Sequence, residues 1–400
     1  MIYRFGTAAL DTDRHRLLVD GADRHVEPQV FALIALLADR APDLVGYDTL
    51  MAEIWGGRIV SDATVAARIS AARAALDDDG KAQRVIRTVP RRGVQMVAEV
   101  ARNDGAGEDG PLAAPAAIER PLTQTIRYTQ SRDGTAIAWA EIGEGPPLLR
   151  GGHWLSHLEH DWHSPIWHPL LERLARGRRL IRYDPRGTGL SDRRLGGATL
   201  TDYVDDMIAV ADAAGLDRFP VYAISQSVPI ALSLAARWPD RVSRMILLNG
   251  LVRGSTARGD REATDTMVAM IRSGWGVAGS PFMRAVATLY MPRATPEELE
   301  SLVALQSVSA TPEMAAEIRR LVGDIDVSDI LHQVRAPALI MHCAGDVIQS
   351  PEQSKLIARS LSGAEFSLCD SPNHIVVPSD PIWGPCLEAF DRFLAAEPVA

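Results

Sequence analysis

Apolar residues in the first hundred positions follow two different periods. Short alternating runs predict strands at 3–5 and 17–19, and apolar residues at helical spacing predict helices near 28–40 and 47–55. A third helix is expected to begin after Ser61 or Asp62, both favourable N-cap residues. Its buried stripe is Val65, Ile69, Ala72 and Leu76. Two further strand-like runs, 85–89 and 94–97, flank 90–93 and predict a hairpin with a basic tip.

From residue 124 onward, apolar strands alternate with helical segments, an order typical of a mostly parallel sheet flanked by helices. The expected strands are 126–129, 136–141, 147–150, 180–184, 219–224, 244–248, 338–342 and 365–369. Between about 251 and 325 the apolar period is helical throughout. Its Met and aromatic residues favour the core of a helical insertion, with the lining of an apolar pocket as the alternative.

The composition is that of a globular protein, since 46% of the 400 residues are hydrophobic and 23% are charged. This length predicts two or three domains. Residues 101–121 are rich in Gly, Ala and Pro without apolar periodicity, so we expect a flexible linker there. The predicted domains are therefore 1–100 and 122–400.

The net charge of −9 argues against a protein coated in basic surface for nucleic-acid binding. The charge is unevenly divided, however, because residues 1–100 carry 13 Lys and Arg against 14 Asp and Glu. Five basic residues and no acidic one lie between Lys81 and Val97. A local basic patch in the first domain therefore remains compatible with the acidic total.

Three cysteines in a chain of this length do not form a disulfide framework, which predicts a reducing compartment. The first residues contain no apolar segment of a secretory signal. The longest purely apolar run, 30–38, is far shorter than the roughly 20 residues that a membrane helix needs. We expect a cytoplasmic protein that does not bind membranes.

The segment from Val60 to Val100, with the preceding Trp55-Gly56 and the Ile86-Arg87-Thr88-Val89 run before Arg92-Gly93, resembles the winged helix-turn-helix of OmpR/PhoB-type transcription regulators. The likeness covers about residues 1–100. It implies that the third helix enters the major groove of double-stranded DNA and that the wing contacts the neighbouring backbone. The alternative is a winged helix retained only for protein contacts.

The resemblance implies a DNA-binding set on the third helix and the wing, namely Thr64, Arg68, Ser70, Arg73, Arg91 and Arg92. The exposed face of this helix is rich in alanine, where the family usually carries polar residues. Alanine contacts only a thymine methyl group, so sequence readout is expected to depend on few contacts or on DNA shape. DNA readers of this kind commonly act as homodimers, which we expect here as well.

A possible nucleophile follows the predicted strand 219–224. Ser225 has small residues two positions before and two after it, Ala223 and Ser227, as a tight strand-to-helix turn requires. Ser227 is a poor alternative, because that register places Pro229 where a small residue is needed.

An acid and a base follow in the order expected for such a nucleophile. Asp346 comes just after strand 338–342, and His374 comes just after strand 365–369. Open α/β sheets build their sites at the carboxyl ends of their strands, so Ser225, Asp346 and His374 are expected to meet there.

This part of the chain, about 124–396, resembles the α/β-hydrolase superfamily. A second match is the turn Tyr183-Asp184-Pro185-Arg186-Gly187-Thr188-Gly189-Leu190-Ser191-Asp192. The resemblance implies a helical cap at 251–325, Ser225 as nucleophile, His374 as general base and Asp346 as its orienting carboxylate. It implies an oxyanion hole made by the N–H of Gln226 and one N–H from Gly152, His153 or Trp154. The usual His-Gly pair is replaced by Arg150-Gly151, which leaves the second donor open.

Five of the ten histidines lie between His153 and His168. Their spacing matches no zinc ligand pattern and no cysteine accompanies them, so we predict neither a metal nor a cofactor.

The fold class expected is an α/β hydrolase with a helical cap, preceded by an α+β winged-helix domain. The function expected is a DNA-binding transcription regulator whose hydrolase domain senses, and hydrolyses, a small ester-like or carbonyl-containing ligand. The alternatives are an inert sensor domain that keeps the triad residues, and a serine hydrolase with an accessory winged helix.

Overall fold

The computed structural model describes residues 1–19, 22–56, 60, 62–78, 83–89, 92–103, 122–193, 196–277 and 280–396. The chain divides into two compact units, Met1–Arg120 and Pro121–Ala400. None of the helices in the described ranges is both long and apolar enough to cross a membrane.

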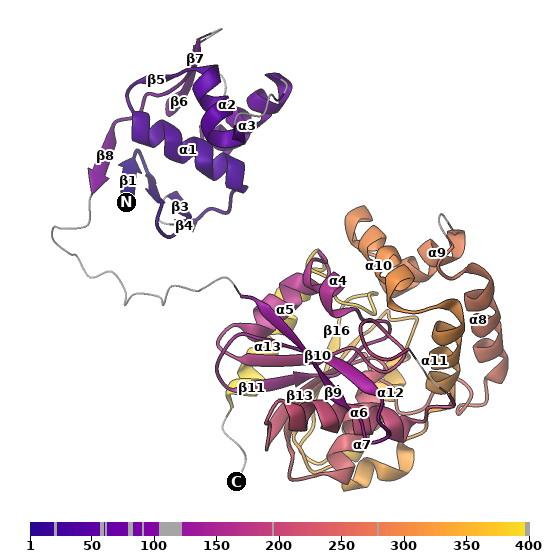
Figure 1. Cartoon of the computed structure of the whole chain (residues 1–400). Coiled ribbons are helices and arrows are strands. Elements are labelled where there is room, and N and C mark those ends of the chain that lie inside the picture. Colours follow the sequence, from indigo (N-terminus) through magenta and orange to yellow (C-terminus); the bar gives the residue numbers. More distant parts are fainter. Residues whose placement is uncertain are drawn as a thin grey trace. The chain divides into compact units, whose positions relative to one another are not determined.

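The first unit is a winged-helix domain built from two small sheets and three helices (Figure 1). The larger sheet has the strand order β4-β3-β2-β1-β8, and the wing sheet has the order β5-β7-β6. The helices are α1 (Pro28–Arg40), α2 (Tyr47–Trp55) and α3 (Asp62–Ala75). The strands are β1 (Ile2–Phe5), β2 (Ala8–Asp11), β3 (Arg16–Val19), β4 (Ala22–Asp23), β5 (Leu44–Val45), β6 (Ile86–Val89), β7 (Gly93–Met96) and β8 (Val100–Asn103).

One core holds this unit together, because the buried stripes of all three helices converge on it. Leu10 and Leu17 from the large sheet, Ile34 and Leu37 from α1 and Val94 from the wing sheet are almost completely buried in it. Burying one such side chain contributes about 1.5–3 kcal/mol. The expected stripe Val65, Ile69, Ala72 and Leu76 belongs to the same core.

The predicted start of the linker is wrong by three residues. Residues 101–103 form the end of β8, which pairs antiparallel with β1 along Ile2–Phe5. Period-based reasoning misses this strand because an edge strand of four residues with little apolar content shows no alternation. Of the expected linker, residues 104–121 lie outside the described residues.

The second unit is an α/β-hydrolase domain with an eight-stranded sheet in the order β16-β15-β14-β13-β11-β12-β10-β9. In this sheet β10 pairs antiparallel with both β9 and β12, and all the other neighbouring strands are parallel. The strands are β9 (Gln124–Gln130), β10 (Ala136–Ile142), β11 (Pro147–Arg150), β12 (Arg179–Tyr183), β13 (Phe219–Ile224), β14 (Val242–Leu248), β15 (Ala338–Cys343) and β16 (Glu365–Cys369).

Helices cover both faces of this sheet, which explains why its central strands are apolar throughout. In β13, Val221 and Ala223 pack into one core, whereas Tyr222 and Ile224 pack into the core on the opposite face. The first core includes residues of α6 (Leu200–Ala213), α7 (Ser227–Arg237) and α12 (Pro351–Ser360). The second includes residues of α5 (Trp167–Ala175) and α13 (Trp383–Ala395).

Four helices are inserted between β14 and β15 and lie together beside the sheet (Figure 1). They are α8 (Arg261–Gly274), α9 (Pro281–Tyr290), α10 (Pro296–Ser309) and α11 (Pro312–Asp324). Trp275, Met283 and Met314 form part of a separate core within this cap. By contrast, Met270 is 43% exposed.

Candidate active site

Ser225 occupies a strained turn at the carboxyl end of β13. Its φ of +56° lies in the left-handed region, which is uncommon for a residue with a side chain. Its N–H donates to the Leu248 carbonyl at 3.0 Å, which fixes the turn against the end of β14. Strain of this kind collects at functional sites, and a sharp turn between a strand and a helix presents a serine hydroxyl at the top of the sheet.

Ser227 supports this turn. Its hydroxyl donates to the Ile224 carbonyl and accepts from the Ile224 N–H, both at 2.8 Å. A Cβ added to Gly151 would lie 2.9 Å from the Ser227 Cβ, so the loop after β11 approaches closely only because residue 151 is glycine.

Asp346 and His374 form a buried pair on the loops after β15 and β16. His374 Nδ1 lies 2.7 Å from Asp346 Oδ2. The other carboxylate oxygen accepts from the Ile348 N–H at 2.8 Å and the Gln349 N–H at 3.1 Å. His374 is only 1% exposed. Its Nδ1 donates to Asp346 Oδ2, and the two backbone N–H groups hold that carboxylate in place.

The other ring nitrogen of His374 is the one that a general base would use. His374 Nε2 is buried and makes no hydrogen bond within the described part of the chain, Ser225 included. Catalytic hydrogen bonds are often formed only when substrate is bound. The structure thus brings Asp346 and His374 together. It places Ser225 beside the end of β14, and the residue after β14 supports the Asp346 and His374 loops.

That support is Asn249, a residue that the sequence analysis missed. It follows β14 with a φ of +48°. Its side-chain amide donates to the His374 carbonyl at 2.7 Å, and its Oδ1 accepts from the Cys343 N–H at 2.7 Å. The Ser225 N–H donates to the carbonyl of Leu248, the residue before Asn249. Residues 248–249 therefore link the three strand ends that carry the candidate triad. An Asn just after a buried strand was the available signal.

The comparisons with known proteins agree with this geometry. Residues 160–374, more than half of the chain, match the family described as serine aminopeptidase, S33. The chain belongs to this family. Residues 21–96 match the family described as transcriptional regulatory protein, C terminal, so an OmpR/PhoB-type winged helix is fused to an α/β-hydrolase domain.

Two relatives of known name each match about three fifths of the chain. A protein named "Putative carbamate hydrolase RutD" from Azorhizobium caulinodans is 29% identical over 255 residues, 60% of this chain and 89% of that protein. An (E)-2-((N-methylformamido)methylene)succinate hydrolase from Acinetobacter baylyi is 22% identical over 257 residues, 64% of this chain and 92% of that protein.

Among solved structures, the enol-lactonase from Burkholderia xenovorans has a TM-score of 0.55 at 23% identity, covering 68% of this chain and all of that one. A thermophilic esterase from Thermogutta terrifontis has a TM-score of 0.56 at 22% identity, covering 68% of this chain and 98% of that one. At these identities the likeness concerns the fold.

In this member of the S33 family, the loop after β11 is held by buried polar contacts. His153 Nδ1 lies 2.9 Å from the Trp154 carbonyl and its Nε2 lies 3.3 Å from Asp161. Its ring stacks on Trp167 with the centroids 4.2 Å apart. Burial lowers the pKa of His153, and the Arg150 charge adds to this, whereas Asp161 opposes it. The side chain of His153 therefore fixes the loop and leaves only backbone N–H groups for an oxyanion.

The turn after β12, at 183–192, anchors the same loop. Asp184 accepts from the Ser156 hydroxyl at 2.7 Å, the Leu158 N–H at 3.1 Å and the Leu190 N–H at 2.9 Å. Burial raises the pKa of Asp184. Gly152 has no room for a side chain, because a Cβ there would lie 2.2 Å from Pro185 Cγ. Gly152, His153 and Trp154 are therefore placed by the turn. Gln226 is the N-cap of α7, where the first N–H groups have no intrahelical acceptor.

The cap reaches the candidate base through Tyr290 at the end of α9. The Tyr290 carbonyl accepts from the N–H of His374 at 2.8 Å and from the N–H of Ile375 at 3.1 Å. The two rings meet edge to face with their centroids 5.3 Å apart. Tyr290 is therefore a part of the site that the sequence left undecided between core and pocket lining.

Among the five histidines between 153 and 168, His153 is paired with the Asp161 carboxylate. In the part of the chain that the structure describes, no three His, Cys, Asp or Glu side chains are grouped so as to hold a metal ion.

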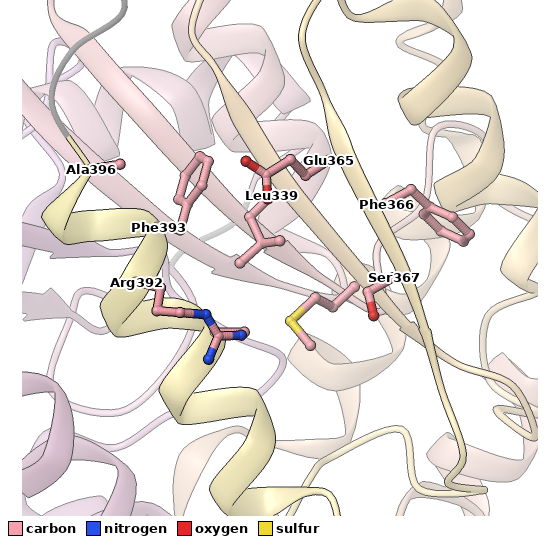
Figure 2. Close-up of a pocket in the computed structure, with 9 residues that line it drawn as sticks. Leu339, Glu365, Phe366, Ser367, Arg392, Phe393 and Ala396 are labelled. Carbon is pink, nitrogen blue, oxygen red and sulfur yellow. The ribbon is translucent and has the colours of Figure 1, made fainter.

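A hollow of about 290 Å³ lies elsewhere, between β15, β16 and α13 (Figure 2). It is lined by Leu339, Met341, Glu365, Phe366, Ser367, Ala389, Arg392, Phe393 and Ala396. None of these residues belongs to the loops that carry Asp346 and His374, so this hollow is separate from the candidate site.

On the winged helix, the predicted DNA-binding residues differ in their surroundings. Ser70 and Arg92 are exposed. Arg68 is committed within the unit, with Nη1 2.6 Å from Glu27 and Nε donating to Gln29 at 3.2 Å. Thr64 is half-buried, and Arg91 lies outside the described residues.

Arg73 is likewise bound within the unit, which the sequence did not predict. Its Nε donates to the Ile86 carbonyl at 3.0 Å and its Nη2 to the Thr88 hydroxyl at 2.7 Å. Arg73 therefore fastens α3 to β6 of the wing sheet, because a residue near the end of a helix can turn its guanidinium back to a neighbouring strand.

Proposed function

We propose that the chain is a DNA-binding transcription regulator whose hydrolase domain binds and hydrolyses a small ligand with an ester-like or amide-like carbonyl. One observation carries this proposal. A strained Ser225 lies beside a buried Asp346–His374 pair joined at 2.7 Å, in the same chain as an OmpR/PhoB-type winged helix. Neither part alone would combine ligand chemistry with DNA recognition.

The proposed chemistry is acyl transfer to water. Ser225 Oγ attacks the ligand carbonyl while His374 Nε2 takes the hydroxyl proton, and Asp346 stabilises the resulting imidazolium. The oxyanion accepts hydrogen bonds from the Gln226 N–H and one N–H of Gly152, His153 or Trp154. His374 returns the proton to the leaving group, and water then releases the acyl group from Ser225 by the same steps in reverse order.

The relatives favour a carbonyl attached to nitrogen or oxygen. The names of the two relatives quoted above state hydrolysis of a carbamate and of an N-methylformamido compound. Both reactions would use a nucleophile, a base and an oxyanion hole in the positions described here. We therefore place carbamates and amides beside esters in the proposed ligand class.

The proposed regulation needs the ligand to bind two states of the protein unequally, since only a difference in affinity shifts an equilibrium. A homodimer that reads two half-sites on double-stranded DNA is the proposed DNA-bound form.

The first test measures DNA binding. Fluorescence anisotropy of the full chain should show tighter binding to the DNA upstream of its own gene than to a scrambled sequence at moderate salt. Phenyl acetate should change this affinity in Ser225→Ala, which binds the ester without consuming it. Equal affinity for both DNA sequences would reject the regulator.

The second test measures hydrolysis and addresses the alternative of a serine hydrolase with an accessory winged helix. Release of nitrophenol from 4-nitrophenyl acetate should fall to the background rate in Ser225→Ala. Hydrolysis without sequence-dependent DNA binding would favour the enzyme alternative. Equal rates in the two proteins would remove Ser225 from the mechanism.

A further inference from the structure

The cap contains a buried carboxylate that the proposed chemistry does not use. Glu298 lies in the first turn of α10 and is only 5% exposed. Glutamate is seldom buried to this extent unless its oxygens are hydrogen-bonded, because removing a charge from water is costly. The donors that satisfy Glu298 therefore show what this side chain holds in place.

Glu298 joins the cap to the segment that follows the candidate base. Its Oε2 accepts from the Ser379 hydroxyl at 2.6 Å, and its Oε1 accepts from the Ser379 N–H at 3.3 Å. Oε2 also accepts from the Thr295 N–H at 2.7 Å, which completes the capping box of α10. Hydrogen bonds to an ionised carboxylate are stronger than neutral ones, so this contact ties Ser379 firmly to the start of α10.

The same part of the cap also holds the beginning of this loop. The Arg293 N–H donates to Asn373 Oδ1 at 3.0 Å, and the Tyr290 carbonyl accepts from the N–H groups of His374 and Ile375. Residues 290–298 therefore bind the loop 373–379 at both of its ends. His374 lies between the two points of attachment.

A second buried carboxylate closes this loop on itself. Asp380 is 2% exposed, and its Oδ2 accepts from the Ser371 hydroxyl at 2.5 Å and from the Asn373 side-chain amide at 2.6 Å. Its Oδ1 accepts from the Ile382 N–H at 3.1 Å. Because Asp380 connects the residue after Ser379 to the residue before His374, a displacement at Ser379 is transmitted to His374.

The helix that carries Glu298 is a firm support. Leu302 and Leu305 of α10, with Met291 just after α9, belong to the core on one face of the eight-stranded sheet. At the end of α10, the Ser309 carbonyl accepts from the Gly189 N–H at 2.8 Å. This part of the cap is therefore packed on the sheet domain along the length of α10.

We infer that Glu298 is a positioning residue of the proposed reaction. Acting from the cap through Ser379, it holds the loop that carries His374, so that the base stays aligned with Asp346 and with the hydroxyl of Ser225. The Asp346 side of this arrangement is held by N–H groups of its own loop, whereas the His374 side depends on the cap. The inference rests on the proposed function, because it assigns a residue to that reaction.

The kinetic test measures 4-nitrophenyl acetate hydrolysis by the full chain. Glu298→Ala should lower kcat about 10- to 100-fold, because a catalytic group displaced by about 1 Å can lose on the order of 10² in rate. KM should change by less than about 2-fold, since His374 serves both acylation and deacylation. Glu298→Gln should recover most of the activity, because its amide oxygen can still accept from the Ser379 hydroxyl and the Thr295 N–H.

Ser379→Ala removes the same contact from the other side and leaves the capping box of α10 intact. It should lower kcat to a similar extent, and the double variant should lose no more than the larger of the two single losses. Glu297→Ala is the matched control, because Glu297 precedes Glu298 in the same helical turn and is exposed. It should leave kcat and KM unchanged.

Hydrogen exchange of the full chain provides a readout that does not depend on turnover. In Glu298→Ala, the amides of His374, Ile375 and Ser379 should exchange about 10-fold faster, while those of β15 keep their wild-type rates. An equal rise throughout the second unit would indicate general destabilisation and would overturn the positioning role.

The two readouts separate this inference from the proposed chemistry. If Ser225→Ala hydrolyses the ester as fast as the wild type, the proposed function fails, and the exchange rates alone decide whether Glu298 positions the loop. Faster exchange confined to 373–379 then supports the inference, and unchanged exchange overturns it. If hydrolysis requires Ser225 but Glu298→Ala retains the wild-type kcat, only the positioning role fails.

Discussion

The imidazole of His342 lies 3.6 Å from Asp346 Oδ2, the same oxygen that accepts the hydrogen bond of His374. His342 is completely buried at the end of β15. Its Nε2 faces the Gln349 carbonyl at 3.0 Å, so this nitrogen carries the proton, and its Nδ1 accepts from the Ser354 hydroxyl at 2.7 Å. His342 therefore holds the loop from Asp346 to Gln349 and, through it, the orientation of the candidate base.

Acid is expected to destabilise the second unit through His342. Burial lowers the pKa of His342, and the neighbouring His374 lowers it further, while the Gln349 carbonyl and Asp346 oppose this. Below the ordinary histidine pKa of about 6.5, the unfolded chain binds a proton that the folded state resists. The contribution is fully present above that pH and is lost as the pH falls. Urea unfolding at pH 8 and pH 5 measures the difference.

His342→Gln should reduce this pH dependence, and part of the remainder is expected from His153, whose pKa is lowered in the same direction. His332→Gln, at an exposed position, provides the control and should retain the wild-type dependence. A pH dependence that is identical in all three proteins would show that His342 does not titrate on unfolding.

Asp346→Asn is expected to lower kcat for 4-nitrophenyl acetate about 10³- to 10⁴-fold with the fold intact. An amide in place of the carboxylate can donate to His374 Nδ1 and so select the tautomer whose Nε2 carries the proton, which cannot act as a base. Urea unfolding of Asp346→Asn should match that of the wild type, which excludes misfolding, while its pH-rate profile should show the loss of the base. Retained activity would indicate that another group orients His374.

Much of the fold could be predicted because its elements carry strong local signals. The predicted bounds of α1 and α2 match the structure, as do those of β11, β13 and β16. These segments have continuous apolar runs or clear helical spacing. By contrast, three of the four residues of β8 fall within the predicted linker, because this strand pairs with β1, about a hundred residues away in the sequence.

The residues of the candidate site likewise fall into two groups, those that the sequence identifies and those that only the structure shows. Ser225, Asp346 and His374 follow strand ends, where short motifs identify them. Asn249, His342 and Tyr290 have no motif, and their contacts with the Asp346 and His374 loops exist only after distant segments come together. For Arg73 the sequence suggests a function where the structure shows a structural contact. Its position on α3 favours DNA contact, whereas its guanidinium donates to β6 of the wing sheet.

Asn249→Ala is expected to destabilise the second unit by about 2–5 kcal/mol. The change leaves the Cys343 N–H and the His374 carbonyl buried without partners, each costing about 1–3 kcal/mol. It also places alanine at a positive φ that asparagine tolerates better. Urea unfolding measures this loss.

Asn249→Asp is the matched variant, because it keeps the acceptor for Cys343 and loses the donor to His374. The lost donor leaves a buried carboxylate oxygen against the His374 carbonyl, so Asn249→Asp should destabilise the second unit at least as much as Asn249→Ala. A clearly smaller loss than in Asn249→Ala would contradict the donor role of this side chain at His374.

Variants of Arg92 and Arg73 should distinguish a direct contact with DNA from structural support of the wing. Arg92 is exposed next to the hairpin turn, so Arg92→Ala should weaken DNA binding across sequences and reduce the salt slope of log K by about 0.9. Arg73→Ala removes two hydrogen bonds to β6 and should lower the stability of the first unit by about 1–2 kcal/mol.

Anisotropy across a salt series and urea unfolding of the full chain measure the two effects, with Arg4→Ala, at an exposed position of β1, as the control. Arg73→Ala changes both readouts because a displaced wing also loses its phosphate contacts, whereas Arg92→Ala changes only the binding. An unchanged salt slope in Arg92→Ala would place the wing away from the DNA backbone. In that case α3 alone, with its alanine-rich exposed face, would have to supply the contacts, and the affinity should then respond to Ser70→Ala.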